Sequence, residues 1–326
     1  MPGLAVCTAW QTTNYDGLPH RSRAGAVVFV WALLVWGTGL AAEERVERPF
    51  VGVEHIIRTE TSPRPLRIHV VKIDLTAPGI RFKLTPPAGK RGTVRQTTLD
   101  FMKQEGAQIA VNGHFFIPFP TTDSDVWLVG FAASGGVVYS GCEKPAQSYA
   151  IVTAAAALNI DAANRATIVH CDPASEDGKR ILEPVAIGTA VAGSAQIVTG
   201  GLKTIPGYAG PLTPGGPGNF SEAQSWYDLR NARTAIGLSQ DGRTLILFTV
   251  DARGGSAGMS GGEVADMLIK DYGVYNALNL DGGGSTTLAM TDAAGNASIV
   301  NTPSANAQGR AVGSNLAVFA NLAPAK

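Results

Sequence analysis

The sequence predicts an α+β fold with a mixed, strand-rich sheet core, a few helices and a single main domain. The 326 residues include 39 glycines and 19 prolines but only 16% charged residues, a composition typical of many short strands joined by turns. A hydrophobic content of 45% is sufficient for a substantial core. The 26 basic residues balance 26 acidic ones, so no overall field favours nucleic acid as a partner.

The first 42 residues have the pattern of an export signal. Basic residues between positions 20 and 23 precede an apolar run at 24–42, and Gly39 and Ala41 fit the small residues before a signal-peptidase cut. An uncleaved N-terminal anchor is the alternative, because the run has roughly the length that crosses a bilayer. Either interpretation places the remaining chain in the periplasm or outside the cell, with membrane contact only through this segment.

Cysteine usage agrees with export. Cys7 precedes the cleavage site, which leaves Cys142 and Cys171 in an oxidising compartment. We therefore predict a disulfide between these two residues.

Local patterns predict the elements that follow. Charge and proline at 43–65 indicate an exposed lead-in, and the domain is expected to start at residue 66. Alternating β-branched residues indicate strands, and a helix is expected where a threonine N-cap candidate and a closing glycine enclose "LDFMKQE". In order, we expect strands at 66–75 and 80–86, a helix at 97–106, a strand at 108–116, and short strands at 126–132, 136–140, 148–153 and 167–171.

Residues 200–225 are so rich in glycine and proline that they predict a long loop. A linker between domains is one interpretation. We favour a surface or active-site loop inside one domain, because loops of this length are uncommon unless functional.

The C-terminal third predicts a sheet edge that carries chemistry. Residues 233–252 read as a hairpin with an Asp-Gly turn, 260–273 as a helix and 274–280 as a strand. A strand–helix–strand crossover would place Asp251 and Asp281 at the same ends of two parallel strands. In open α/β sheets, ligands bind beyond such strand ends, so we expect a shared site.

The stretch "LDGGGST" is the strongest candidate for that site. Glycines after Asp281 would let backbone N–H groups approach an anion, and Ser285 adds a hydroxyl. A tight Asp-Gly turn is the alternative, although three glycines exceed what such a turn requires.

Other polar residues gain meaning beside this loop. Asn112 and His114 end an apolar strand and therefore require polar partners or a ligand. Arg233 offers a planar fork for phosphate or carboxylate. The chain lacks G-x-S-x-G, H-E-x-x-H and C-x-x-C motifs, which argues against a serine esterase or zinc hydrolase. A divalent cation held by Asp, Asn and His remains an open alternative, so we assign no cofactor.

Five ordered motifs resemble the phosphodiester glycosidase family: "AVNGHFF", "RTAIGL", "VDARGGSAGMSGGEVADML", "ALNLDGGGSTTL" and "QGRAVGSNLAVF". The resemblance covers roughly residues 65 to 322 and implies a phosphodiester glycosidase domain at 66–322. It implies an exported α+β hydrolase that cleaves the glycosidic bond of a sugar-1-phosphodiester. We expect a role in exopolysaccharide or cell-envelope glycan metabolism.

The resemblance also implies which residues form the site. The catalytic carboxylates would be Asp281 with Asp251 or Glu263, because glycosidases commonly use two. His114 and the "DAR" sequence depart from the family pattern, which affects the expected substrate more than the reaction class. The substrate- and phosphate-binding residues would be Asn112, Gly113, His114, Arg233, Thr234, Arg253, Gly282, Gly283, Gly284, Ser285 and Arg310.

Two other functions fit the same residues. One is a non-catalytic polysaccharide-binding module, and the other is a metal-dependent phosphodiesterase that cleaves the P–O bond.

Overall fold

The computed structural model describes residues 42–142, 156–205 and 225–324. The chain divides at Leu40, and only the unit from Leu40 to Lys326 contains described residues. The export segment up to residue 41, the strand predicted at 148–153 and residues 206–224 of the predicted loop lie outside them. Within the described ranges, no helix is long and apolar enough to span a membrane.

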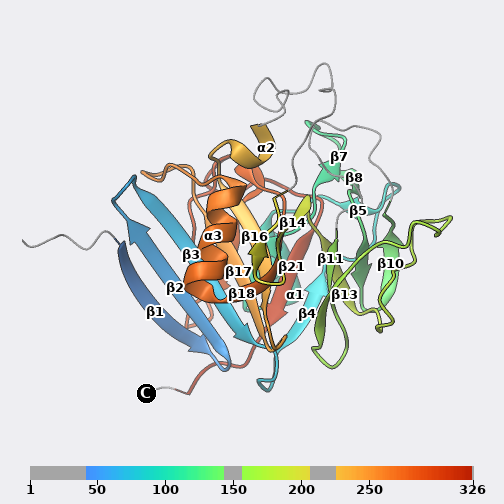
Figure 1. Ribbon diagram of the computed structural model, residues 1–326, viewed down its shortest axis with the longest axis horizontal. Helices are drawn as coiled ribbons and strands as arrows, with labels where there is room; N and C mark the ends of the chain where they lie inside the picture. The colour runs from blue at the N-terminus through green and yellow to red at the C-terminus, as the bar shows by residue number, and fades with distance from the viewer. Residues whose placement is uncertain (1–41, 143–155, 206–224, 325–326) are drawn as a thin grey trace, which may run out of the picture. The chain divides into compact units, whose positions relative to one another are not determined.

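The fold is α+β, as predicted, and the largest of its sheets has eight strands (Figure 1). Their order across the sheet is β1 (Ala42–Phe50), β2 (Val53–Glu60), β3 (Leu66–Asp74), β17 (Thr244–Val250), β16 (Arg233–Ser239), β18 (Val274–Asn279), β14 (Ala195–Thr199) and β15 (Leu202–Lys203).

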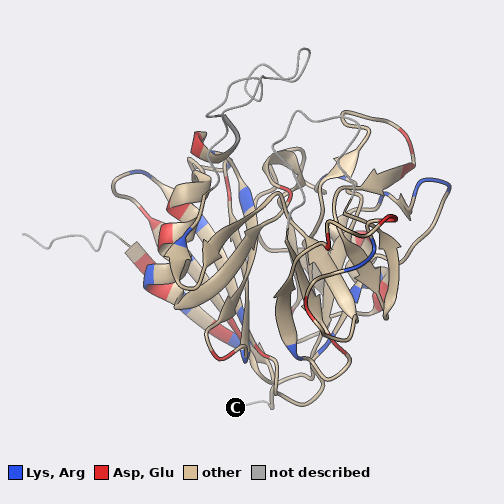
Figure 2. Ribbon diagram, turned by 45° about the vertical axis from the view of Figure 1, so that its right-hand side comes forward, with Lys and Arg blue, Asp and Glu red and all other residues tan. Residues whose placement is uncertain are grey.

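The central strands of this sheet are buried on both faces. On β17, Leu245 and Leu247 face one apolar cluster, whereas Ile246 and Phe248 face another. Alternate side chains of a strand point to opposite faces, so burial on both sides explains the continuous apolar run "LILF". In Figure 2 these inner strands are largely uncharged, and the charged residues lie mainly on β1, β2, α3 and the loops.

The helix predicted at 260–273 forms α3 (Gly261–Tyr272), which covers one face of the eight-stranded sheet. The Ser260 hydroxyl accepts from the Glu263 N–H, and the Glu263 carboxylate accepts from the Ser260 N–H. This capping box starts the helix, and Gly273 ends it in a left-handed conformation. Val264 and Leu268 are fully buried against the sheet.

The structure corrects the prediction of an exposed lead-in at 43–65. Residues 42–50 and 53–60 instead form β1 and β2, which pair with each other and then with β3. β1 is mostly exposed and therefore carries charge, which explains the prediction, but Val53 and Ile56 of β2 enter the core. Local composition did not reveal that the partner strand β3 was available.

A five-stranded sheet lies across the central core from the large one. On its outer face, Phe101 and Met102 of α1 (Thr98–Glu105) pack against small alanines of the sheet, which permit close approach of the helix. The strand order is β20 (Ala297–Ile299), β19 (Leu288–Thr291), β6 (Ile109–Asn112), β21 (Asn315–Phe319) and β4 (Arg81–Leu84).

Two further sheets and two short helical turns complete the described elements. The second five-stranded sheet has the order β10 (Val137–Ser140), β9 (Ala132–Ser134), β13 (Thr189–Ala192), β11 (Ala157–Ile160) and β12 (Ala166–Val169). The smallest has the order β5 (Thr93–Val94), β8 (Asp125–Leu128) and β7 (Phe116–Ile117). The turns are α2 (Ser225–Asp228) and η2 (Gly283–Ser285).

The predicted disulfide is present between Cys142 and Cys171, whose Cα atoms lie 5.9 Å apart. It joins the segment after β10 to the segment after β12, the two outer strands of this second sheet. The bridge therefore closes a long chain segment onto one sheet.

The large sheet brings Asp251 and Asp281 to one edge, namely the one at which strands β17 and β18 end. Both β17 and β18 pair antiparallel with β16, which lies between them. They are therefore parallel to each other, as the crossover prediction requires, although an antiparallel strand separates them. Asp251 follows the end of β17, Asp281 follows the end of β18, and Arg233 begins β16 at the same edge.

Candidate active site

Asn112 connects the ends of the two main sheets. Its side-chain N–H donates to the Asp281 carbonyl at 2.6 Å, and its oxygen accepts from the Thr234 hydroxyl at 2.8 Å. The same oxygen accepts from the Thr287 N–H at 3.1 Å. Asn112 is fully buried, so these bonds satisfy most of its polar capacity and fix the start of the glycine loop.

Asp281 is the carboxylate at the centre of the cluster, with a side chain only 7% exposed. Burial raises the pKa of Asp281 to about 6, although the Ser285 hydroxyl, the Arg310 charge and the Gly282 N–H each oppose that rise. The Gly282 N–H donates to its carboxylate at 2.9 Å. A carboxyl group with this pKa exists in both protonation states near neutral pH, as acid–base or nucleophilic chemistry requires.

The glycine loop uses most of its own N–H groups. The Gly282 N–H binds the Asp281 carboxylate, the Gly283 N–H donates to the Ala232 carbonyl, and the Ser285 N–H donates to the Gly282 carbonyl. Among the hydrogen bonds of the described residues, the Gly284 N–H has none. Of the N–H groups at 282–285, only that of Gly284 is therefore left by the described residues to approach an anion in this conformation. Gly283, with φ of 58°, takes the left-handed conformation that glycine favours.

Arg310 reaches this loop from a different part of the chain. Its guanidinium donates to the Ser285 hydroxyl oxygen at 3.2 Å and lies over the ring of Phe119, 4.8 Å from the centroid. A Cβ on residue 284 would overlap the guanidinium, so the close approach requires glycine at Gly284. Asp281, Ser285 and Arg310 thus form one connected group.

Asp251 holds the segment that leads to Arg310. Its two carboxylate oxygens accept from the Asn301 side chain at 2.9 Å and from the Thr302 N–H at 3.0 Å. Burial raises the pKa of Asp251, against these hydrogen bonds. Asn301 in turn donates to the Thr286 carbonyl at 3.3 Å, which connects Asp251 to the glycine loop.

Arg253 contributes to the same support. It is exposed, and its guanidinium donates to the Ser304 carbonyl at 3.1 Å. Together, Asp251 and Arg253 fix residues 301–304 from one side.

Glu263 is engaged at the start of α3. Its carboxylate accepts from the Ser260 N–H at 2.8 Å and forms an ion pair with Arg64 at 2.7 Å. Burial raises its pKa, but these two partners outweigh burial, so the pKa of Glu263 is lowered overall. These contacts give Glu263 a structural role in the helix cap and do not join it to the Asp281 group.

His114 and Gly113 belong to the packing beneath the loop. The His114 ring is fully buried, with Nδ1 2.9 Å from the Ser314 hydroxyl and Nε2 3.0 Å from the Phe131 carbonyl. Burial lowers the pKa of His114 to about 4, so the ring is neutral at neutral pH and presents no cation to a phosphate. A Cβ at Gly113 would lie 2.6 Å from the Ser314 hydroxyl, and the Gly113 carbonyl accepts from the Asp281 N–H.

Arg233 is buried at the start of β16, with only 2% exposure. Its guanidinium donates to the Leu229 carbonyl at 2.6 Å and the Met259 carbonyl at 3.2 Å. Burial lowers the pKa of Arg233 to about 10, so the side chain stays charged at neutral pH. It places a fixed positive charge beneath the strand edge that carries Asp281.

The structure also identifies supporting residues that sequence patterns missed. Asn301 donates to the Thr286 carbonyl of the glycine loop, Ser314 fixes His114 beneath that loop, and Phe119 supports Arg310. Ser314 lies inside a motif and was therefore available as a signal. Asn301 and Phe119 belong to no motif, because their importance arises only when distant segments meet.

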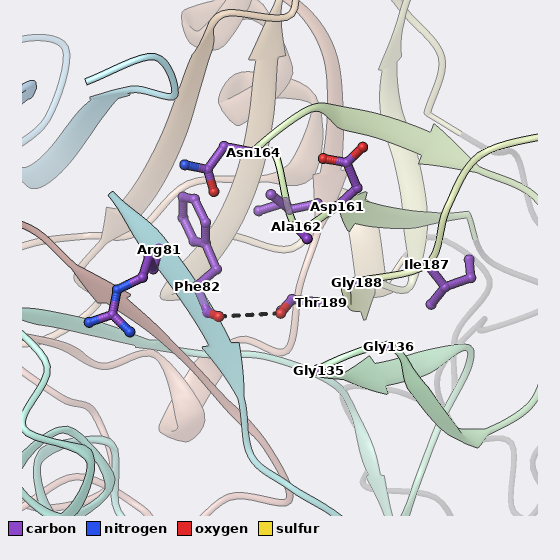
Figure 3. A pocket seen from close by; sticks show the side chains of 11 residues that line it. Arg81, Phe82, Gly135, Gly136, Asp161, Ala162, Asn164, Ile187, Gly188 and Thr189 are labelled. Carbon is purple, nitrogen blue, oxygen red and sulfur yellow. Dashed lines mark hydrogen bonds between the residues drawn. The ribbon is translucent and has the colours of Figure 1, made fainter. Parts of the chain in front are cut away.

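Two cavities lie away from this cluster. One of about 350 Å³ is lined by residues of β4, β11, β13 and adjoining loops, including Arg81, Asp161 and Asn164 (Figure 3). The other, of about 500 Å³, contains His55 and His69. No residue of the Asp281 group lines either cavity. In the described parts of the chain, no group of three or more His, Cys, Asp or Glu side chains is arranged to hold a metal, so we name no metal ligands.

A family comparison covers most of this architecture. The model of the phosphodiester glycosidase family matches residues 105–319. The N-acetylglucosamine-1-phosphodiester alpha-N-acetylglucosaminidases of Mus musculus and Homo sapiens are 40% and 41% identical to this chain over 73 residues. That stretch is 22% of this chain and only 13% of each relative's length.

Solved structures agree at the level of fold. The catalytic domain of the zebrafish N-acetylglucosamine-1-phosphodiester alpha-N-acetylglucosaminidase, auto-inhibited by its pro-peptide, aligns with a TM-score of 0.54 at 21% identity over 87% of this chain and 85% of its own. A hypothetical protein from Synechocystis aligns with a TM-score of 0.56 at 16% identity over 86% of this chain and 68% of its own. At such identities the likeness shows the fold alone.

Proposed function

Because the chain belongs to the phosphodiester glycosidase family, we propose that it hydrolyses the glycosidic bond of a sugar-1-phosphodiester. The observation that carries the proposal is the buried Asp281 carboxyl, whose pKa is raised to about 6 and which connects through Ser285 to Arg310. A carboxylate beside a fixed cation suits a reaction at a sugar carbon that bears a phosphate.

Asp281 acts at the anomeric carbon, either directly as nucleophile or by activating water. Glycosidases commonly use two carboxyl groups, one of which protonates the leaving oxygen. A phosphate leaving group reduces that requirement, because it takes the bonding electrons of the broken C–O bond and needs mainly charge stabilisation. Overall, water supplies a hydroxyl to the sugar, and its remaining proton goes to the phosphate monoester or to solvent.

The contacts of Asp251 and Glu263 support positioning roles for these two residues. Both Asp251 oxygens bind the segment at 301–302, and Glu263 caps α3 and pairs with Arg64. We therefore assign the reacting carboxylate to Asp281. Arg310, Ser285 and the Gly284 N–H would bind the phosphate.

The first experiment measures turnover of a panel of sugar-1-phosphodiesters by wild type and Asp281→Asn. The substitution keeps an acceptor for the Gly282 N–H but removes the carboxylate, so the folded variant should lose turnover by several orders of magnitude. Unchanged turnover by folded Asp281→Asn would contradict the assignment. Asp241→Asn, in an exposed hairpin turn, serves as the matched control and should retain activity.

The bond that breaks separates the glycosidase from the phosphodiesterase alternative. In ¹⁸O water, attack at the anomeric carbon places label in the sugar, whereas P–O cleavage places it in the phosphate. Parallel assays with and without a chelator report whether a divalent cation is required. A protein that binds the substrates without any turnover would be a polysaccharide-binding module.

Export and a role in exopolysaccharide or cell-envelope glycan metabolism form part of the same proposal. The disulfide between Cys142 and Cys171 supports export, because such bonds persist in oxidising compartments. Fractionation of cells that produce the full chain, with N-terminal sequencing of the mature protein, tests export and cleavage. A protein found wholly in the cytoplasm would contradict this part.

A further inference from the structure

We propose that Arg95 and Arg310 together form a two-guanidinium subsite for the substrate phosphate, an inference that rests on the phosphodiester chemistry proposed above. Arg95 lies in none of the motifs that indicated the site. Its place beside Arg310 comes from the tertiary structure alone.

The two guanidinium groups share one aromatic support. The Arg95 Cζ atom lies 5.5 Å from the centroid of the Phe116 ring, and the Arg310 Cζ atom lies 4.8 Å from that of Phe119. The two rings meet edge to face, with centroids 5.7 Å apart. Aromatic faces hold each cation at a fixed height while leaving N–H groups free to donate.

Arg95 is also fixed to the segment that carries Arg310. Its Nε donates to the Ala311 carbonyl at 3.1 Å, and Nη1 donates to the carbonyls of Thr121 and Asp123 at 2.9 Å each. The next residues, Gln96 and Val312, exchange two backbone hydrogen bonds. Three bonds therefore orient the guanidinium before any ligand arrives, and its Nη2 makes no hydrogen bond within the described residues.

Two carboxylates act on these cations without forming an ion pair with them, Asp281 near Arg310 and Asp123 near Arg95. In the described ranges, neither Arg95 nor Arg310 forms an ion pair with a carboxylate. The neighbouring acid, Asp123, pairs instead with Arg91. Burial and then the charge of Arg310 lower the pKa of Arg95, as expected for two cations that lie near each other. Two neighbouring guanidinium groups that form no ion pair within the described residues favour an anion that both can contact.

This subsite is continuous with the reacting group. Arg310 donates to Ser285, and both Ser285 and the Arg310 charge act on Asp281 to oppose the rise of its pKa. A phosphate held by both arginines would present its glycosidic oxygen toward Asp281. Because negative charge on the phosphate grows as the C–O bond breaks, a second guanidinium would stabilise the leaving group more than the bound substrate.

Direct binding of dimethyl phosphate, a diester monoanion, tests the subsite without turnover. Calorimetric titration of the full chain at constant ionic strength should show binding of dimethyl phosphate and none of neutral trimethyl phosphate. Arg95→Gln and Arg310→Gln should each weaken binding about tenfold, because each removes a charged hydrogen-bond donor. Arg81→Gln is the matched control, since it removes a guanidinium stacked on Phe319 outside the subsite, and it should bind like wild type.

Equal binding by Arg95→Gln and wild type would overturn the proposal, as would equal weakening by Arg81→Gln. Because the Arg95 side chain also donates to three backbone carbonyls, Arg95→Gln tests local folding as well as phosphate binding. Phenylglyoxal modification of wild type, mapped by mass spectrometry, avoids any variant. Dimethyl phosphate should slow modification of Arg95 and Arg310 but not of Arg81; an unchanged rate at Arg95 would reject the subsite.

These measurements separate the subsite from the proposed reaction. Protection of Arg95 without turnover of any sugar phosphodiester would contradict the hydrolase function and retain the anion subsite. Turnover of a sugar phosphodiester, with no slowing of Arg95 modification by dimethyl phosphate, would support the hydrolase function and exclude Arg95 from the phosphate subsite.

Discussion

Replacing Asp281 by asparagine should make the protein more stable above pH 6 while abolishing its activity. Burial is the main reason that the pKa of Asp281 stands at about 6 instead of its ordinary 3.8. The native state therefore holds this proton between those values while the unfolded chain loses it. By linkage, stability falls as pH rises through this window, and the full penalty is present above pH 6.

The size of the penalty follows from the two pKa values. They differ by about two pKa units, and each unit corresponds to ~1.4 kcal/mol, so the ionised carboxyl destabilises the fold by about 3 kcal/mol at pH 8. Near pH 4 the same relation gives only about 0.5 kcal/mol. Asparagine carries no charge and still accepts a hydrogen bond from the Gly282 N–H. At high pH the variant should therefore be more stable than wild type by most of this free-energy difference.

Urea unfolding of wild type and Asp281→Asn near pH 4, 6 and 8, followed by tryptophan fluorescence, measures the effect. The difference in free energy of unfolding should increasingly favour the variant as pH rises. Asp241→Asn is the control: hydrogen bonds, first from Ser239, lower the pKa of Asp241, so its substitution should be unfavourable at high pH, the opposite sign. A pH-independent difference for Asp281→Asn would refute the reasoning about burial.

Three further outcomes are expected. The kcat/KM for a sugar phosphodiester should rise with pH through about 6, because the proposed role needs ionised Asp281; a falling profile would assign this carboxyl as the acid. Gly284→Ala should weaken dimethyl phosphate binding about tenfold by displacing the Arg310 guanidinium, whereas Gly262→Ala, whose Cβ would meet only the Ser260 hydroxyl at 3.9 Å, should bind normally. Burial lowers the pKa of His69 to about 3 from 6.5, so wild type should lose stability as pH falls below 6.5. Urea unfolding of His69→Gln should show a shallower acid loss, and an unchanged loss would exclude His69 as its cause.

Local sequence patterns predicted those elements well that are determined by interactions between residues close together in the chain. The helix at 260–273 begins with the Ser260–Glu263 capping box and ends at Gly273, all of which stand next to each other in the chain. The Asp-Gly hairpin after β16 formed for the same reason. The lead-in at 43–65 failed, because its pairing depends on β3 and on burial that composition does not report.

The roles of residues in the candidate site depended on long-range contacts. Motifs identified Asp281 and Arg310, but His114 and Glu263 proved to be occupied in packing and helix capping. Asparagine and carboxylate side chains look equally suited to substrates and to internal bonds until their partners are known. Asn112 illustrates this, since three of its bonds reach other segments of the same chain.

The sequence by itself determined the fold class, the capped helices, the cysteine pair and the strand-end motif around Asp281, because periodicity, caps and turn residues act over a few positions. Only the tertiary structure decided that Asp281 is buried enough to raise its pKa, and that Arg95 lies beside Arg310 on two aromatic rings. Burial and electrostatic coupling depend on which distant segments the folded chain brings together, and no local pattern encodes those distances.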